Sequence, residues 1–238
     1  MIEVRPFDSL GNADHGWLKA RHHFSFARYV DRKRMSHGSL RVWNDDEIAP
    51  NTGFPPHPHA AMEIVTYVRQ GAITHEDNLG NKGRTEAGDV QVMSAGSGIR
   101  HSEYNLEDEP TTLFQIWIEP DTQDGEPISG QRPFWGRKPF PRESRAGAFV
   151  PLASGFEDDG EALPIRAQAR VLGVTLKAGE IAEYRLGTRR HAYLVSAEGD
   201  IEVNGLAVNA RDGVAITNET VLAVKALEDA EIVLVDAP

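Results

Sequence analysis

Residues 53–68 read GFPPHPHAAMEIVTYV, and this stretch decides the fold of the chain. Its second part, EIVTYV, is rich in β-branched and aromatic residues and is typical of a β-strand. His57 and His59 precede that strand at positions i and i+2, which face the same side of an extended chain about 6.6 Å apart. Two imidazoles so placed can bind one metal ion. Pro58 has no N–H to donate, which favours a strand at the edge of a sheet.

A second stretch repeats this arrangement. Residues 88–105 read GDVQVMSAGSGIRHSEYN, in which His101 and Glu103 again stand at i and i+2. Together the two stretches offer three imidazoles and one carboxylate, a ligand set that suits Fe, Mn, Co, Ni, Cu or Zn. We therefore expect one transition metal at His57, His59, His101 and Glu103. The two-residue period of side-chain direction along a strand would also allow Glu63 to be the carboxylate ligand.

Working outward, the rest of the chain shows further short strands. Two strand patterns lie at residues 40–43 and 112–118. After a stretch rich in proline and glycine, strand patterns resume at 171–176, 193–196, 200–203, 213–216, 221–224 and 231–235. Strands at this spacing, with turn residues between them, predict an all-β sandwich or barrel.

Prolines and glycines crowd residues 119–164. This stretch is too long for a plain loop in one compact domain, so we interpret it as a junction with at most short helical turns. The expected organisation is a metal-binding domain at 1–125, a junction at 126–165 and a second domain at 166–238.

Composition excludes several functions. The chain has no cysteine, which rules out disulfides and thiolate ligands, and its formal net charge of −11 disfavours direct binding to nucleic acid. No stretch approaches the roughly 18 apolar residues of a membrane span. Residues 1–5, MIEVR, lack a signal-peptide pattern, so a cytoplasmic location is expected.

The two histidine stretches, together with ARHHFSFARY at 20–29 and LRVWNDDEIAPNTGFPPHPH at 40–59, resemble the pirin family of the cupin superfamily. The resemblance continues more weakly through LPIRAQARVLGVTLKAGE at 163–180. It implies two cupin-type, jelly-roll-like β-barrel domains packed face to face, with few short helices. It also implies metal in the first domain alone, in keeping with a second half whose one histidine is His191.

The resemblance further assigns residues around the expected metal. It selects Glu103 rather than Glu63 as the carboxylate ligand. Glu63 is then expected to accept a hydrogen bond from a ligand imidazole and so to orient it. Phe54, Met93 and Gln115 are weaker candidates for lining a substrate pocket. We expect His75 to be structural or to stand behind the ligands.

Bacterial pirin-like proteins are similar to quercetin 2,3-dioxygenases, the quercetinases. The resemblance therefore implies a flavonol-cleaving oxygenase with one divalent metal per chain, first of all Fe(II), with Ni, Co, Mn, Cu or Zn as alternatives. Its substrates would be a small aromatic molecule and dioxygen, carbon monoxide would be released, and Glu103 would act as the general base. Two alternatives stay open: a metal- or redox-sensing regulator that binds a protein partner, and a cupin that binds a small molecule without using oxygen.

Overall fold

The computed structural model describes residues 1–123, 126–127 and 131–238, and their regular secondary structure is almost entirely β-strand. The helical segments found there are three short 3-10 helices, Phe7–Ser9, Arg142–Arg145 and Glu157–Asp159. The expected all-β class with few short helices is confirmed. Within the described residues, no helix has the length and apolar character needed to cross a membrane.

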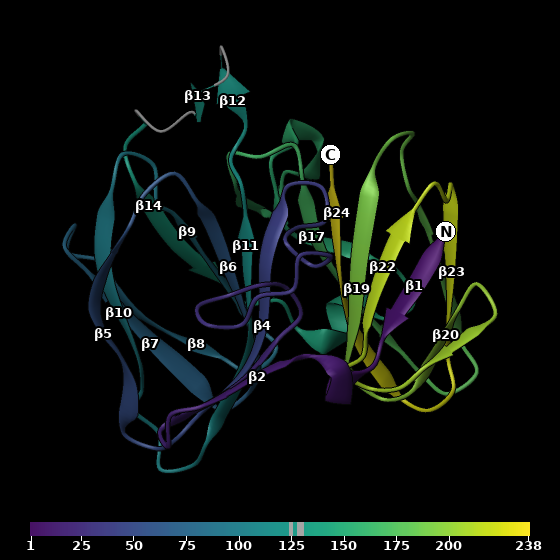
Figure 1. Cartoon of the computed structure of the whole chain (residues 1–238), viewed down its shortest axis with the longest axis horizontal. Helices are drawn as coiled ribbons and strands as arrows, with labels where there is room; N and C mark the ends of the chain where they lie inside the picture. The colour runs from purple at the N-terminus through teal and green to yellow at the C-terminus, as the bar shows by residue number, and fades with distance from the viewer. Residues whose placement is uncertain (124–125, 128–130) are drawn as a thin grey trace.

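The N-terminal half forms two antiparallel sheets that face each other (Figure 1). The larger sheet has the order β14-β9-β6-β11-β4-β3-β2, and the smaller has the order β5-β10-β7-β8. The larger sheet comprises β2 (Gly11–Asp14), β3 (Leu18–His22), β4 (Leu40–Ile48), β6 (Glu63–Gln70), β9 (Val90–Ser94), β11 (Thr111–Ile118) and β14 (Phe134–Lys138). The smaller comprises β5 (Thr52–His59), β7 (Ala72–Asp77), β8 (Lys82–Glu86) and β10 (Ile99–Asn105).

The C-terminal half repeats the design, with a large sheet of order β1-β22-β19-β24-β17-β15-β16 and a small one of order β18-β23-β20-β21. The large sheet comprises β1 (Ile2–Arg5), β15 (Val150–Ser154), β16 (Leu163–Pro164), β17 (Arg170–Leu176), β19 (His191–Glu198), β22 (Gly213–Thr217) and β24 (Ala230–Ala237). The small one comprises β18 (Ile181–Arg185), β20 (Ile201–Val203), β21 (Leu206–Val208) and β23 (Val221–Ala226). A short pair, β12 (Thr122–Gln123) and β13 (Glu126–Pro127), stands apart. The sheets of each half remain open, so each domain is a cupin-like sandwich rather than a closed barrel.

Strand pairing crosses the divisions expected from the sequence. The first strand, β1, pairs with β22 and lies in the C-terminal half (Figure 1). The expectation of a junction without strands at 126–165 is wrong, because β14, β15 and β16 fall inside it. β14 and β16 are outer strands, where proline and glycine are tolerated. Because these residues usually indicate loops, the composition of the stretch did not predict the two strands. The expected boundary at residue 125 lies outside the described residues, and the domain limits remain a prediction.

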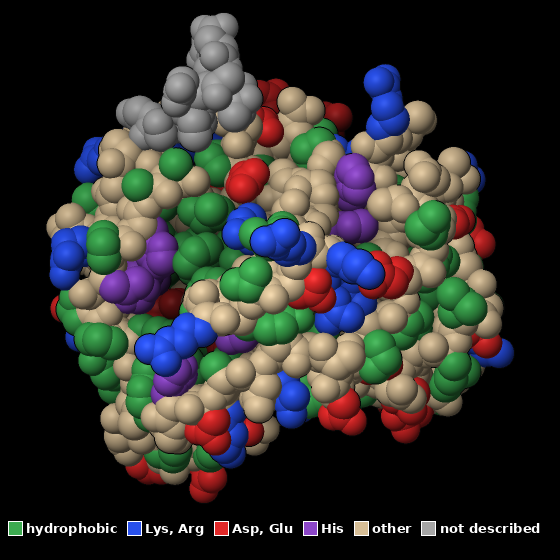
Figure 2. All heavy atoms as spheres, viewed as in Figure 1, with side chains coloured by type: hydrophobic (Ala, Val, Ile, Leu, Met, Phe, Trp, Pro, Cys, Tyr) green, Lys and Arg blue, Asp and Glu red, His purple; other side chains and the backbone are tan. Residues whose placement is uncertain are grey.

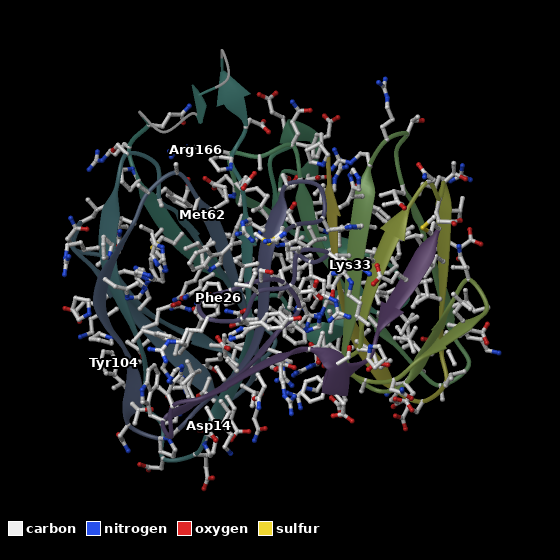
Figure 3. The ribbon with its side chains drawn as sticks, in the orientation of Figure 1. Asp14, Phe26, Lys33, Met62, Tyr104 and Arg166 are labelled. Carbon is white, nitrogen blue, oxygen red and sulfur yellow. The ribbon has the colours of Figure 1, made fainter. Side chains whose placement is uncertain are left out.

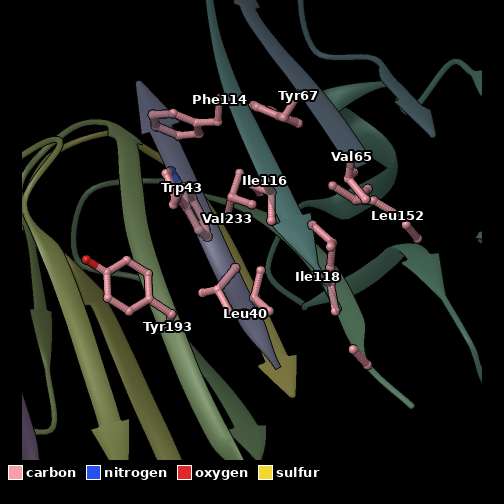
Figure 4. Close-up of a cluster of buried hydrophobic side chains, with 14 of the residues drawn as sticks. Leu40, Trp43, Val65, Tyr67, Phe114, Ile116, Ile118, Leu152, Tyr193 and Val233 are labelled. Atoms are coloured by element: carbon pink, nitrogen blue, oxygen red, sulfur yellow. The ribbon is translucent and has the colours of Figure 1, made fainter. Parts of the chain in front are cut away.

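The largest hydrophobic core lies between the two large sheets. Trp43, Tyr67 and Phe114 of the first half pack with Tyr193 and Val233 of the second (Figure 4). The face-to-face packing of two cupin domains is thereby confirmed. Because the large sheet of the N-terminal domain is covered on both faces, the first six residues of β6 are all buried.

Candidate metal centre

Three imidazoles converge where β5 and β10 pair. His57 lies directly opposite His101 in the register of these strands, and their Nε2 atoms are 3.1 Å apart. The ring of His59 is centred 4.8 Å from that of His57 and 5.0 Å from that of His101. One ligand nitrogen of each histidine lies within 4.8 Å of the others. β5 is an outer strand of its sheet, as the proline between the two histidines predicted.

The donor set fits a divalent transition ion. Two nitrogens bound side by side, each at about 2.1 Å from one ion, would be roughly 3.0 Å apart, close to the observed 3.1 Å. Burial and the neighbouring imidazoles lower the pKa of His101 to about 2, and burial with the neighbouring His57 lowers the pKa of His59 to about 4. Both rings are therefore neutral and keep a lone pair for coordination.

Hydrogen bonds fix which nitrogen carries the proton. Nδ1 of His57 lies 2.8 Å from the carbonyl oxygen of Pro55, which can only accept, so Nε2 keeps its lone pair. Nε2 of His75 donates to Asp77 Oδ2 at 3.0 Å, which leaves Nδ1 of His75 as an acceptor. That nitrogen lies 3.4 Å from Nδ1 of His101, so His101 donates there and presents the Nε2 lone pair towards His57.

Hydrogen bonds link Asp77 through His75 to His101. The position of His75 agrees with the expectation that it stands behind the ligands, but the part played by Asp77 was not predicted from the sequence. A signal was present, since His75 and Asp77 form a third i, i+2 pair on one strand, β7. Trp135 stacks on the His75 ring with centroids 4.7 Å apart and holds it in place.

Glu103 is buried, with 3 % of its surface exposed. Its Oε1 accepts from Gln91 Nε2 at 2.6 Å and from Thr66 Oγ1 at 3.5 Å, and its Oε2 accepts from Gln115 Nε2 at 2.9 Å. Burial raises the pKa of Glu103 to about 7, against the effect of these hydrogen bonds. The carboxylate forms a second possible ligand group with His75 and His101, and this group shares His101 with the group of three imidazoles.

The donors to Glu103 belong to a polar row that crosses the large sheet. In the strand register Thr66 lies opposite Gln91 on one side and opposite Gln115 on the other. The row continues through Asn44 to His22. Of the three donors to Glu103, only Gln115 was predicted from the sequence to lie at the site, because Thr66 and Gln91 join it through strand pairing that no local pattern reveals.

Glu63 lies elsewhere. Its carboxylate accepts from Ser94 Oγ at 2.8 Å and from the backbone N–H of Arg166 at 3.1 Å. The expectation that Glu63 orients an imidazole is wrong, because these partners place it at the junction with the C-terminal half. Arg166 and Met62 are both labelled in Figure 3.

Two of the three expected pocket residues line a cavity beside the centre. Phe54 and Gln115 are part of the wall of a cavity of about 500 Å³. Met93 is instead 3 % exposed, within an apolar cluster with Ile64 and Ile99, so its expected role in the pocket is wrong. Figure 2 shows histidine side chains at the rim of a hollow on the N-terminal half.

Comparison with known proteins agrees with this geometry. Residues 3–118 match the family model described as Pirin, and residues 152–237 match the one described as Quercetinase C-terminal cupin domain. Fold and site thus define a two-domain cupin protein. The chain belongs to the pirin family.

Individual relatives extend over the whole chain. A pirin-like protein of Caulobacter vibrioides is 68% identical over 237 residues, covering 100% of both chains. The quercetin 2,3-dioxygenase of Escherichia coli (strain K12) is 37% identical over 239 residues, covering 100% of this chain and 99% of the relative. The crystal structure of the bacterial pirin YhhW from Escherichia coli in complex with nickel(II) superposes with a TM-score of 0.91 at 36% identity, covering 100% of this chain and 99% of that one.

Proposed function

We propose that this protein is a metal-dependent dioxygenase that cleaves flavonols such as quercetin, consuming dioxygen and releasing carbon monoxide. The observation that carries the proposal is the convergence of three imidazoles, two of them with Nε2 atoms 3.1 Å apart, next to a buried carboxylate. The relatives support the choice of reaction, since one with 37% identity is named quercetin 2,3-dioxygenase.

His57, His59, His101 and Glu103 are the proposed ligands of one divalent ion. Fe(II) is our first choice, and nickel follows because YhhW was crystallised with it. When bound, such an ion lowers the pKa of a hydroxyl group that it coordinates. A cytoplasmic location remains a prediction.

The surrounding residues position the reacting groups. Glu103 is the proposed base for the flavonol hydroxyl proton, and the amides of Gln91 and Gln115 hold one oxygen each. Trp117 donates from Nε1 to Gln115 Oε1 at 3.1 Å, which fixes the direction in which the Gln115 amide points. The ring of Trp117 also packs edge-on against His59, with centroids 5.0 Å apart, and shields that imidazole from water.

The test combines elemental analysis with turnover. We expect about one metal ion per wild-type chain, and the loaded protein should consume oxygen and release carbon monoxide with quercetin. His101→Ala should lose both metal and activity, because it removes the central imidazole of the group. Ser102→Ala alters the neighbouring residue, whose hydroxyl contacts the Glu76 carbonyl on the exposed side, and should retain both.

Two results would overturn the proposal. One is a fully loaded wild-type protein that neither consumes oxygen nor releases carbon monoxide with quercetin. The other is a His101→Ala variant that behaves like the wild type.

A further inference from the structure

The cavity beside the metal centre is larger than the centre needs. It is lined by residues of β2, β3 and β4, and its volume of about 500 Å³ suits one drug-sized ligand. Asp14 and Phe26 of its wall are labelled in Figure 3. Two wall residues tie it to the centre. Gln115 donates to Glu103, and the Phe54 ring is centred 6.2 Å from that of His57.

Asp46, in the wall of this cavity, lacks the partner that a buried carboxylate needs. It is 2 % exposed, and its Oδ1 has no hydrogen-bond partner among the described residues. The adjacent Asp45, on the opposite face of β4, is paired with Arg69 and with Arg211. Leaving a buried polar group unpaired destabilises the fold, and more so for a charged group, so its presence calls for a reason.

Two other polar side chains of this wall, those of Asn44 and Gln115, are already engaged in hydrogen bonds. Asn44, two residues earlier on the same face of β4, accepts from Nδ1 of His22 at 2.8 Å. Gln115 uses its nitrogen on Glu103 and its oxygen on Trp117. Within the described part of the wall, Asp46 is the residue with a buried side-chain atom left unpaired.

The surroundings of Asp46 define the chemistry of a ligand. Phe26, Phe54 and Leu18 supply apolar wall, which favours a flat aromatic body. Burial raises the pKa of Asp46 well above the usual range, and the negative potential of Asp45 and Glu103 adds to this effect. An anionic group would be repelled there, whereas an uncharged hydroxyl could donate a hydrogen bond.

We propose that Asp46 is a specificity-determining residue that accepts a hydrogen bond from a hydroxyl group on the substrate ring that fills the cavity, while the flavonol core lies at the metal centre. The site would thus select uncharged, polyhydroxylated flavonols over those whose pendant ring carries no hydroxyl. This inference rests on the proposed function and deepens it.

The test compares quercetin with galangin, a flavonol that has the same core and no hydroxyls on the pendant ring. Affinities are measured without oxygen on metal-loaded protein. Wild type should prefer quercetin by about tenfold or more, as expected for a hydrogen bond to a carboxylate. In Asp46→Leu the preference should shrink to within about twofold, while in Asp14→Asn, which changes another acid of the same wall, it should persist.

Stability separates recognition from a structural role. Replacing an unpaired buried carboxylate by leucine should leave the thermal midpoint unchanged or raise it. A structural role would instead lower the midpoint, and a lowered midpoint with an unchanged preference overturns the proposal. Asp46→Asn, which keeps an acceptor oxygen, should retain part of the preference.

The remaining outcomes are equally decisive. Equal wild-type affinity for the two flavonols, or an Asp46→Leu variant that keeps the preference, overturns the role of Asp46. Failure of turnover with an intact, Asp46-dependent preference overturns the proposed reaction alone. Loaded protein that binds neither flavonol overturns both.

Discussion

His75 shows how much of the centre is decided by single residues that are not among the proposed ligands. It receives a hydrogen bond from His101, donates one to Asp77, and stacks on Trp135. The effect is to select one tautomer of His101 before a metal arrives. Partners of this kind typically change metal affinity by 10–100-fold when they are removed.

His75→Phe tests this tautomer selection. Phenylalanine keeps the ring that stacks on Trp135 but can neither accept from His101 nor donate to Asp77. We expect the metal dissociation constant, measured by competition with a chromogenic chelator, to rise by about 10–100-fold. His15→Phe, at an exposed position, serves as the control and should bind like the wild type. Unchanged affinity in His75→Phe would show that the hydrogen-bond chain does not orient His101.

Among the elements, the pairing of β5 with β10 has the largest effect on the site. It sets His57 opposite His101, and its register shifts between His101 and Glu103. Close approach of the two strands is possible because residue 53 is glycine. A Cβ at that position would lie 2.2 Å from the Glu103 carbonyl oxygen and 2.5 Å from the Tyr104 Cα.

Gly53→Ala should therefore force β5 away from β10. Backbone on the facing strand cannot yield as a flexible side chain would, so we expect a loss of about 1–3 kcal/mol in the free energy of unfolding. Metal affinity should fall as well, because the two Nε2 atoms separate. Urea denaturation measures the first effect and chelator competition the second.

Gly160→Ala is the matched control for this prediction. A Cβ there would come no closer than 4.0 Å to its nearest neighbour, the Glu157 carbonyl oxygen. The variant should unfold and bind metal like the wild type. Equal behaviour of the two alanine variants would mean that β5 can shift without disturbing the centre.

At the scale of the whole molecule, the two halves share one core. Trp43 and Phe114 of the first half and Tyr193 of the second belong to a single buried cluster. The strand β1 adds a covalent tie, because the chain starts in the sheet of the second half before it builds the first. Neither half could separate without exposing large aromatic surface to water.

We therefore expect the protein to unfold in one cooperative step. Separate unfolding of one half would leave the shared aromatic cluster in water, at a cost that neither half could offset alone. Calorimetry should give equal calorimetric and van't Hoff enthalpies for the metal-free protein. Two resolved transitions would contradict the shared core.

The interface also predicts a dependence of stability on pH. Nδ1 of His23 is 2.9 Å from the hydroxyl of Tyr193, and burial together with nearby arginines holds the pKa of His23 well below 6.5. Below about pH 6.5, His23 therefore binds a proton more readily in the unfolded chain than in the folded protein. The free energy of unfolding should fall as the pH drops below that value, by up to about 1.4 kcal/mol per pH unit from this residue.

His23→Gln isolates this contribution. The variant should be less stable at neutral pH, where Tyr193 loses part of its hydrogen bond, but its stability should decline less steeply between pH 6.5 and 5. Thermal midpoints of metal-free wild type and variant across this range measure the difference. Parallel curves would show that His23 does not titrate on unfolding.

Part of the fold and of the site could be predicted because the information is local. The spacing of His57 and His59 and the proline between them specify an outer strand with two imidazoles on one face, and the β-branched and aromatic residues of EIVTYV specify the strand that follows. The same reasoning placed His101 and Glu103 facing inwards on β10, where both are buried. Strands with proline or glycine, such as β14 and β16, escaped prediction because outer strands tolerate residues that otherwise signal loops.

By itself, the sequence predicted the all-β class and the approach of His57, His59 and His101 to one another, since side-chain direction along a strand follows from its two-residue period. Only the tertiary structure decided that Glu63 belongs to the domain junction, that His75 and Asp77 stand behind His101, and that Asp46 faces a cavity without a partner. These facts depend on which strands pair and in what register. Such pairing joins residues far apart in the chain, and no local pattern encodes it.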